Sequence, residues 1–139
     1  MYIKDSKYRL LKHKKVSFSY GDFYFFEKYI VSEIHEGSHI TYEIAQTLIE
    51  AAVEHYGEGA KLGYISNRIN SYSLLPQDWL KFFKEKNNIV ALAIVAYTKI
   101  SFMNVVLEKI FSSAPIRKFR DMDEAVDWIT KFKEEKVSK

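Results

Sequence analysis

An unbroken apolar run, Ile89–Ala96, is the clearest pattern in the chain. A β-strand shows successive side chains to opposite faces of its sheet. A strand that is apolar at every position therefore has both faces covered, as in the interior of a parallel sheet. A helical pattern follows over residues 100–111, then a short strand pattern over Ile116–Phe119. This alternation predicts an α/β fold with right-handed crossovers.

The first third of the chain has patterns that are typical of antiparallel strands. Residues 16–20 alternate apolar and polar, which predicts a half-buried strand. Gly21-Asp22 suits a tight hairpin turn. Residues 23–26 and 30–34 are rich in aromatic and β-branched side chains, so they predict further strands. We therefore expect an antiparallel meander of two or three strands here, and a mixed sheet overall.

Helix signals lie between the predicted strands. Thr41 is a good N-cap and Gly57 a good terminator, so a helix is expected between them. After a strand at residues 62–66, Pro76 opens a second helix. The segment 100–111 is the third, and the capping pair Asp121 and Glu124 begins the last. The prediction is a single α/β domain with antiparallel N-terminal strands, then βαβαβα, flanked by about four helices.

Length and charge limit the organisation of the chain. Its 139 residues, 47% of them hydrophobic, suit one domain with a single core. Residues 1–14 form a polar basic segment, interpreted as a solvated, frayed end. Residues 15–134 form the domain, and residues 135–139 a frayed tail. The net charge of +3 is mild, so nucleic-acid binding is not expected.

Several kinds of chemistry lack the residues they need. Cysteine is absent, which excludes disulfides and thiolate sites. His35 and His39 flank Gly37 without further ligands at a recognised spacing, so no metal site is predicted. No catalytic or cofactor motif is present, and we expect neither an enzyme nor a bound cofactor. Without a signal peptide or a bilayer-length apolar run, the expected location is cytoplasmic, with no membrane span.

The C-terminal third carries a family resemblance. Its residues are Ala93-Ile94-Val95-Ala96, a helix with Asn104 that ends at Phe111, Arg117-Lys118-Phe119, and Glu124-Ala125-Val126-Asp127-Trp128-Ile129, and the segment from Gly37 to Thr41 also fits. Over roughly residues 16–133 the chain resembles SpoIIAA-like proteins. These are related to STAS domains and share a fold with CRAL-TRIO-like lipid-binding domains. The resemblance implies a non-enzymatic regulatory or protein-interaction module.

The resemblance also points to residues 67–73. STAS anti-sigma antagonists carry a phosphorylatable serine in an Asp-Ser pair at this position, but the Asp-Ser-Ser-Gly pattern is absent here. Ser71 and Ser73 are therefore positional candidates for phosphorylation, in a segment that departs from the family's motif.

A candidate binding site follows from topology. Ligands of open α/β sheets gather at the carboxyl ends of the strands, where residues 67–73 and 97–99 would lie. The candidate residues are Asn67, Arg68, Asn70, Ser71, Ser73, Tyr97 and Lys99. Arg68 would bind a carboxylate or phosphate. The alternative is a loop whose Asn and Ser side chains satisfy local backbone groups.

Two apolar features leave further alternatives open. The first is an aromatic group that is core, or else one face of a homodimer: Tyr20, Phe23, Tyr24, Phe25, Phe26 and Tyr29. The second is the apolar helix at 100–111, which is buried, or else covers a pocket lined by Phe102, Val106 and Trp79 with Arg68 at its mouth. The partners expected are thus a protein, a second copy, or a small apolar or amphipathic ligand.

Overall fold

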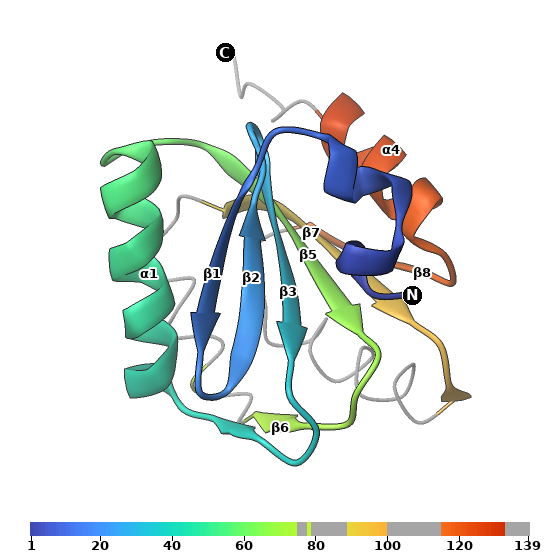
Figure 1. Ribbon diagram of the computed structural model, residues 1–139, viewed down its shortest axis with the longest axis horizontal. Helices are drawn as coiled ribbons and strands as arrows, with labels where there is room; N and C mark the ends of the chain where they lie inside the picture. Colours follow the sequence, from blue (N-terminus) through green and yellow to red (C-terminus); the bar gives the residue numbers. More distant parts are fainter. Residues whose placement is uncertain (75–77, 79–88, 100–114, 133–139) are drawn as a thin grey trace.

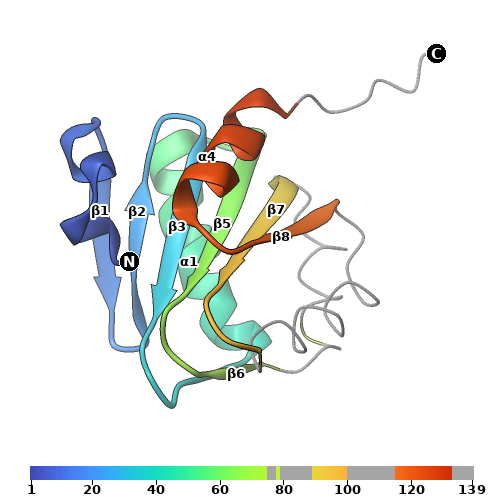
Figure 2. The ribbon, with the colours of Figure 1, turned by 90° about the vertical axis from the view of Figure 1, so that its right-hand side faces the viewer.

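The computed structural model describes residues 1–74, 78, 89–99 and 115–132. A six-stranded sheet runs through this part of the chain (Figure 1). Figure 2 shows helix α4 (Met122–Lys131) in front of the sheet and helix α1 (Tyr42–Tyr56) behind it. Two faces of one sheet are therefore covered by different parts of the chain, as in a layered α/β fold.

The sheet is mixed, as the sequence predicts. Its strands, in spatial order, are β1 (Lys14–Phe18), β2 (Gly21–Phe25), β3 (Tyr29–Ile34), β5 (Leu62–Arg68), β7 (Ile89–Ala96) and β8 (Ile116–Phe119). The pairs β1–β2 and β2–β3 are antiparallel, and the following pairs are parallel. A separate parallel pair joins β4 (His39–Ile40) to β6 (Ser73–Leu74), which the sequence did not predict.

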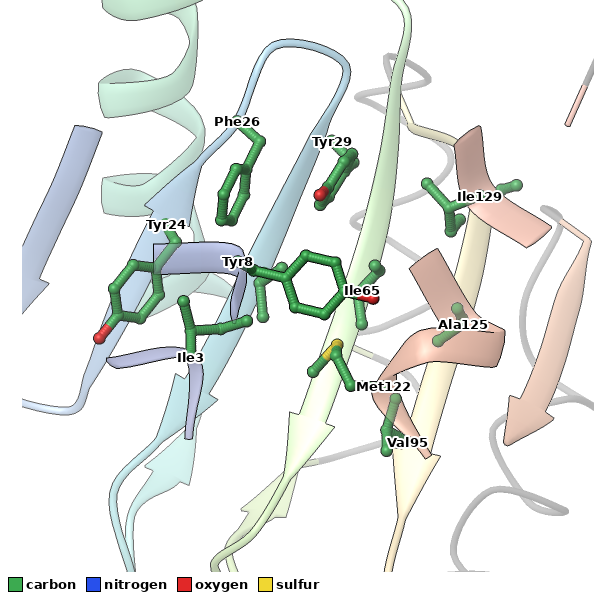
Figure 3. Close-up of a cluster of buried hydrophobic side chains, with 13 residues drawn as sticks. Ile3, Tyr8, Tyr24, Phe26, Tyr29, Ile65, Val95, Met122, Ala125 and Ile129 are labelled. Atoms are coloured by element: carbon green, nitrogen blue, oxygen red, sulfur yellow. The ribbon is translucent and has the colours of Figure 1, made fainter. Parts of the chain in front are cut away.

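Alternate residues of each strand pack on opposite faces. On the α1 face, Phe23, Phe25 and Ile30 pack with Leu48 of the helix. On the α4 face, the buried cluster is made by Ile3, Tyr8, Tyr24, Phe26, Tyr29, Val31, Ile65, Ala91, Ala93, Val95, Met122, Ala125 and Ile129 (Figure 3). Strand β7 lies between β5 and β8, and Ala91 to Ala96 are fully buried. Its apolar character on both faces is thus explained by cover on both faces.

The predicted caps of two helices are confirmed. The Thr41 hydroxyl accepts from the Ile44 amide at 3.2 Å, and Gly57 ends α1 with a φ of 92°. The Asp121 carboxylate accepts from the Glu124 amide at 2.8 Å. Of the four helices expected, α1 and α4 are the two α-helices of the described residues; those expected from Pro76 and over 100–111 lie outside these residues. Among the described helices, none has the length and apolar character to cross a bilayer.

The predicted turn at Gly21-Asp22 is wrong. Ser19 and Tyr20 form the turn, and Gly21 pairs with Phe18 as the first residue of β2. The glycine has another reason to be there: a Cβ at position 21 would lie 2.9 Å from the Glu33 carbonyl oxygen and 3.0 Å from the Ile34 Cα. Strand β3 approaches too closely for a side chain at this position.

The interpretation of residues 1–14 as a solvated end is also wrong. They contain two short 3₁₀ helices, η1 (Ile3–Asp5) and η2 (Lys7–Leu10). Ile3 is 1% exposed and Tyr8 is 7% exposed, and both pack on the α4 face. The basic residues between them stay exposed. The basic composition of this segment therefore gave no indication that Ile3 and Tyr8 pack against the sheet.

The aromatic group is core within a single chain. Phe23 and Phe25 lie on the α1 face, whereas Tyr24, Phe26 and Tyr29 lie under the N-terminal segment and α4 (Figure 3). All five are buried. Tyr20 is half-buried and its hydroxyl lies 2.6 Å from that of Thr47. Of the two alternatives for this group, the five buried rings therefore agree with core.

Candidate functional site

Three polar side chains meet at the carboxyl ends of three parallel strands. Glu33 is the penultimate residue of β3, Asn67 is near the end of β5, and Tyr97 follows β7. They lie on the α4 face, where Glu33 is 3% exposed and Asn67 2% exposed. We call these three residues the edge network. The topological argument from the sequence therefore places Asn67 and Tyr97 together.

The chain's own N-terminal segment fills this network. The Glu33 carboxylate accepts from the Ile3 amide at 2.7 Å and from the Asn67 side-chain amide at 2.9 Å. Asn67 also donates to the Met1 carbonyl at 2.8 Å, and the Tyr97 hydroxyl donates to the Asn67 side-chain carbonyl at 2.8 Å. The polar atoms at the centre of the expected ligand site are thus bonded to one another and to backbone.

Burial governs the electrostatics of the edge network. It raises the pKa of Glu33 above its ordinary value, while the amides of Ile3 and Asn67 act in the opposite direction by bonding to the ionised form. Burial likewise raises the pKa of Tyr97 to about 12, with Glu33 adding to the effect. Tyr97 therefore stays a neutral hydrogen-bond donor at neutral pH.

Arg68 is separated from Asn67 because adjacent strand residues face opposite sides. Its side chain lies on the α1 face and is 6% exposed. The Arg68 Nε donates to the Ser66 hydroxyl at 3.2 Å, and the guanidinium carbon lies 5.2 Å from the centre of the Tyr72 ring. The Ser66 and Tyr72 hydroxyls are 3.1 Å apart. Arg68 is therefore part of a buried polar cluster, not of an open edge shared with Tyr97.

A cavity adjoins this cluster, between α1 and the sheet. It has a volume of about 80 Å³. Its described lining is mostly apolar or aromatic and consists of Tyr20, Phe23, Ile34, Ile40, Thr41, Tyr42, Ala45, Leu48, Tyr64, Ser66, Tyr72, Leu74, Asp78, Ile89 and Leu92. We call it the α1 cavity. A second cavity of about 40 Å³ lies further along α1 and shares Leu48, Tyr64 and Ile89 with it.

Few polar groups face the α1 cavity, and they come from several elements. Ser66 belongs to β5, Tyr72 precedes β6, and Asp78 accepts from the Tyr42 amide in the first turn of α1 at 3.1 Å. Burial raises the pKa of Tyr64, which keeps its hydroxyl neutral. The cavity thus combines apolar walls with a few hydroxyl groups and one carboxylate, that of Asp78, which is bonded to the first turn of α1. The pocket expected around Phe102, Val106 and Trp79 cannot be compared with it directly, since these three residues lie outside the described part.

Three predicted site residues serve the loops instead. Asn70 donates to the Ile34 carbonyl at 3.0 Å. The Ser71 amide donates to the Glu36 carboxylate at 2.9 Å, and the Ser73 hydroxyl lies 2.7 Å from Nδ1 of His39. The partners lie 34 to 36 residues away in the sequence, so these contacts join two loops and differ from the alternative in which Asn and Ser residues satisfy local backbone groups. Phosphorylation of Ser71 or Ser73 stays a prediction.

The histidines near Gly37 bind neighbouring loops. The Nδ1 atom of His35 lies 3.2 Å from the Ser19 carbonyl oxygen, and the His39 ring bonds to Ser73. Across the described ranges, no three His, Asp or Glu side chains are grouped as metal ligands would be.

Lys99 lies at a different surface. It lines a wide, shallow groove of about 760 Å³ between β8 and α4, together with Arg117, Lys118, Phe119, Arg120, Glu124, Asp127, Trp128 and Lys131. We call this the cationic groove. The predicted site is therefore divided among four places: the edge network, the polar cluster beside the α1 cavity, the loop contacts of Asn70, Ser71 and Ser73, and this groove.

Sequence reasoning missed Glu33 and the cavity lining. Glu33 had a signal, because it is the one charged residue in the otherwise apolar or small strand Tyr29–Ile34. A lone carboxylate in a buried strand needs partners. The cavity had no such signal, since the sequence pattern at Ala45, Leu48 and Tyr64 is that of ordinary core residues.

Comparison with known proteins finds a similarity of structure and none of sequence. No family model and no curated protein matches the sequence. Among solved structures, the chain is similar to an uncharacterized protein of the DUF3478 family with a SpoIIAA-like fold, from Shewanella loihica PV-4. The TM-score is 0.51 at 15% identity, over 85% of this chain and 92% of the other. The chain has a SpoIIAA-like fold. At this identity the likeness concerns the fold alone, and it agrees with the family resemblance seen in the sequence.

Proposed function

We propose that this protein is a non-catalytic binding module that takes a small apolar or amphipathic molecule in the α1 cavity. The observation that supports the proposal is the cavity itself, which lies between α1 and the sheet and has largely apolar walls. Ligand sites of this kind are typically apolar, with a few polar groups that orient the ligand.

The size of the cavity limits the ligand. Its volume of about 80 Å³ is well below the roughly 150 Å³ of an engineered cavity that binds benzene. The group that fits is therefore a short aliphatic one, such as a propyl or isobutyl group. The neighbouring cavity along α1 would accommodate further carbons of a longer chain once Leu48 or Tyr64 changes rotamer.

An empty apolar cavity lowers stability. At about 24 cal/mol per Å³, a space of this size costs roughly 2 kcal/mol. A ligand that fills it recovers part of that cost by dispersion contacts and by burial of its own apolar surface. A ligand in the cavity would therefore gain binding free energy from contacts with side chains that are already in place.

The polar cluster suggests which end of an amphipathic ligand meets it. Ser66 and Tyr72 line the cavity, and both contact Arg68. A cation beside hydroxyl groups favours a carboxylate or another anionic acceptor. The proposed ligand is therefore a short aliphatic chain with an anionic or hydrogen-bond-accepting head.

The direct test is thermal unfolding with straight-chain carboxylates from acetate upward. A ligand that binds the folded state raises the melting temperature. We expect the rise to grow with chain length until the cavity is full. In Ala45→Leu the added side chain fills the cavity, so the rise should disappear. Glu50→Leu, at an exposed position of the same helix, is the matched control and should keep it. Equal shifts in both variants, or none in the wild type, would contradict the proposal.

The second candidate is the regulatory or protein-interaction role implied by the SpoIIAA-like fold. The observation that favours it is the cationic groove, an exposed surface that the edge network and the α1 cavity do not use. The cytoplasmic location expected from the sequence belongs to the same proposal. Neither candidate includes catalysis; a turnover abolished by Arg68→Ala or Ser71→Ala would contradict both.

A further inference from the structure

The cationic groove carries a net positive charge. Five of the 21 basic residues and two of the 18 acidic residues line it, which gives it a net charge of +3. All seven charged residues are exposed. A second basic cluster lies at residues 1–15, which contain six basic residues and one acidic residue. A local excess of positive charge raises the local concentration of anionic partners and steers their approach.

Three parts of the chain build the groove. Strand β8 and the residues beside it supply Arg117, Lys118 and Arg120, and the segment after β7 supplies Lys99. Glu124, Asp127, Trp128 and Lys131 lie three or four residues apart, so they form one stripe of α4. The strand side is thus cationic, and the helix side is mixed.

The floor between these walls is aromatic. The rings of Phe119 and Trp128 are 5.9 Å apart between centroids, and both residues are half-buried. The Arg117 guanidinium carbon lies 5.5 Å from the centre of the Phe119 ring. An apolar floor flanked by cations fits a partner that presents apolar and acidic side chains together.

The carboxylates of the helix wall decide between two kinds of polyanion. A single-stranded nucleic acid carries a negative charge at every nucleotide, so it would bring phosphates against Glu124 and Asp127. Lys131 offsets only one of these, since its ammonium lies 2.8 Å from Asp127. A peptide places carboxylates at selected positions, opposite the strand wall, and apolar side chains over the aromatic floor. The groove therefore favours the peptide.

We propose that the cationic groove binds an acidic segment of a partner protein in which carboxylates alternate with apolar side chains. The carboxylates pair with Lys99 and Arg117, and the apolar side chains pack on Phe119 and Trp128. This inference rests on the interaction role named above as the second candidate. It is independent of the α1 cavity.

The test uses fluorescence anisotropy with three labelled probes: a short peptide of alternating glutamate and phenylalanine, the same peptide with glutamine for glutamate, and an oligothymidylate. At an ionic strength of about 0.15 M, where screening beyond roughly 8 Å is strong, we expect the glutamate peptide to bind the wild type most tightly. The double variant Lys99→Glu/Arg117→Glu should weaken its binding by at least about tenfold, because two attractions become repulsions.

The matched control is Lys12→Glu/Lys14→Glu. It makes the same change in net charge at exposed positions beside and on β1, the opposite edge strand of the six-stranded sheet. It should bind the peptide within about twofold of the wild type. The single variant Lys99→Glu, with an intermediate loss, guards against misfolding of the double variant, and melting temperatures of all variants are compared.

Three results would overturn the inference: equal losses in the two double variants, equal binding of the glutamine peptide, or tighter binding of oligothymidylate. A parallel measurement separates the inference from the role on which it rests. If a protein partner remains bound to both double variants purified from the protein's own cells, the groove assignment is wrong and the interaction role stands. If the wild type binds neither peptide nor partner, both are wrong.

Discussion

The two faces of the sheet differ in how tightly the side chains between sheet and helix are packed. On the α4 face, Gly63 and Ile129 are so close that a Cβ on Gly63 would lie 2.5 Å from the Ile129 Cγ2. On the α1 face, Ala45 and Leu48 border a cavity of about 80 Å³. The α4 face is filled by its helix and by the N-terminal segment, whereas the α1 face leaves space. The cavity in which we propose that a small molecule binds therefore lies on the α1 face, away from the strand ends where the sequence placed its candidate polar residues.

The polar groups of the two faces differ in the same way. The edge network satisfies itself, because Glu33 and Asn67 bond to each other and to the backbone of Met1 and Ile3. On the α1 face, Ser66 and Tyr72 are also hydrogen-bonded within the chain, but they lie at the wall of a cavity. Polar groups that border a cavity are the ones that could orient a ligand placed there.

The largest expected effect comes from removing the carboxylate of the edge network. Glu33→Ala leaves the amides of Ile3 and Asn67 buried without their acceptor, so we expect a loss of about 3 kcal/mol in the free energy of unfolding. Urea denaturation measures it, with Glu54→Ala at an exposed position of α1 as the control. A loss as small as the control's would mean that the N-terminal segment is not anchored by Glu33.

Enlarging a side chain should lower the free energy of unfolding on the α4 face and raise it on the α1 face. Gly63→Ala places a methyl group against Ile129, and overpacking of this kind costs about 2 kcal/mol. Ala45→Leu fills the α1 cavity and should add about 1 kcal/mol. Both are measured by denaturation under the same conditions. Destabilisation by Ala45→Leu as large as that by Gly63→Ala would show that the α1 face is as full as the α4 face.

A smaller effect is expected at the solvent side of the edge network. Tyr97→Phe removes the hydroxyl that donates to Asn67, at a residue that is 38% exposed. Water can replace the bond, so the expected cost is about 0.5–1 kcal/mol. Tyr2→Phe, which removes a longer bond of 3.4 Å to Asn70, is the comparison and should cost less. The reverse order would mean that Tyr97 contributes nothing to the network.

The smallest expected effect is a change in pH dependence. Because burial raises the pKa of Glu33, the folded state holds this proton at pH values where the unfolded state has released it. The contribution of Glu33 to the free energy of unfolding therefore falls as the pH rises from the unfolded-state pKa of about 4 through the higher folded-state pKa. In Glu33→Gln this contribution is absent, so its stability relative to the wild type should increase over that window. A parallel pH profile of the two proteins would contradict the assignment.

The mixed character of the sheet could be predicted because strong local signals agree with it. The apolar run of β7, the alternation in the first strands and the caps at Thr41 and Asp121 each report a local preference that tertiary packing did not override. Gly21 was misread because a glycine required by a close strand and a glycine required by a turn look alike in sequence. The anchors Ile3 and Tyr8 were hidden by the basic residues around them.

The site could be predicted only in part, for geometric reasons. Asn67 and Tyr97 meet because their strands are parallel neighbours, which topology predicts. Arg68 faces the other side of the sheet because side chains alternate along β5. Which of the two residues, Asn67 or Arg68, would face α4 was not indicated by any signal in the sequence. The α1 cavity is a property of how Ala45, Leu48 and Tyr64 pack together, and no spacing rule encodes it.

The most direct test of the α1 cavity as a ligand site is native mass spectrometry of the protein purified from its own cells, beside Ala45→Leu and Glu50→Leu prepared in the same way. The account predicts a small mass excess on the wild type and on Glu50→Leu that is absent from Ala45→Leu. An unliganded mass for all three, or the same excess on Ala45→Leu as on the wild type, would contradict it.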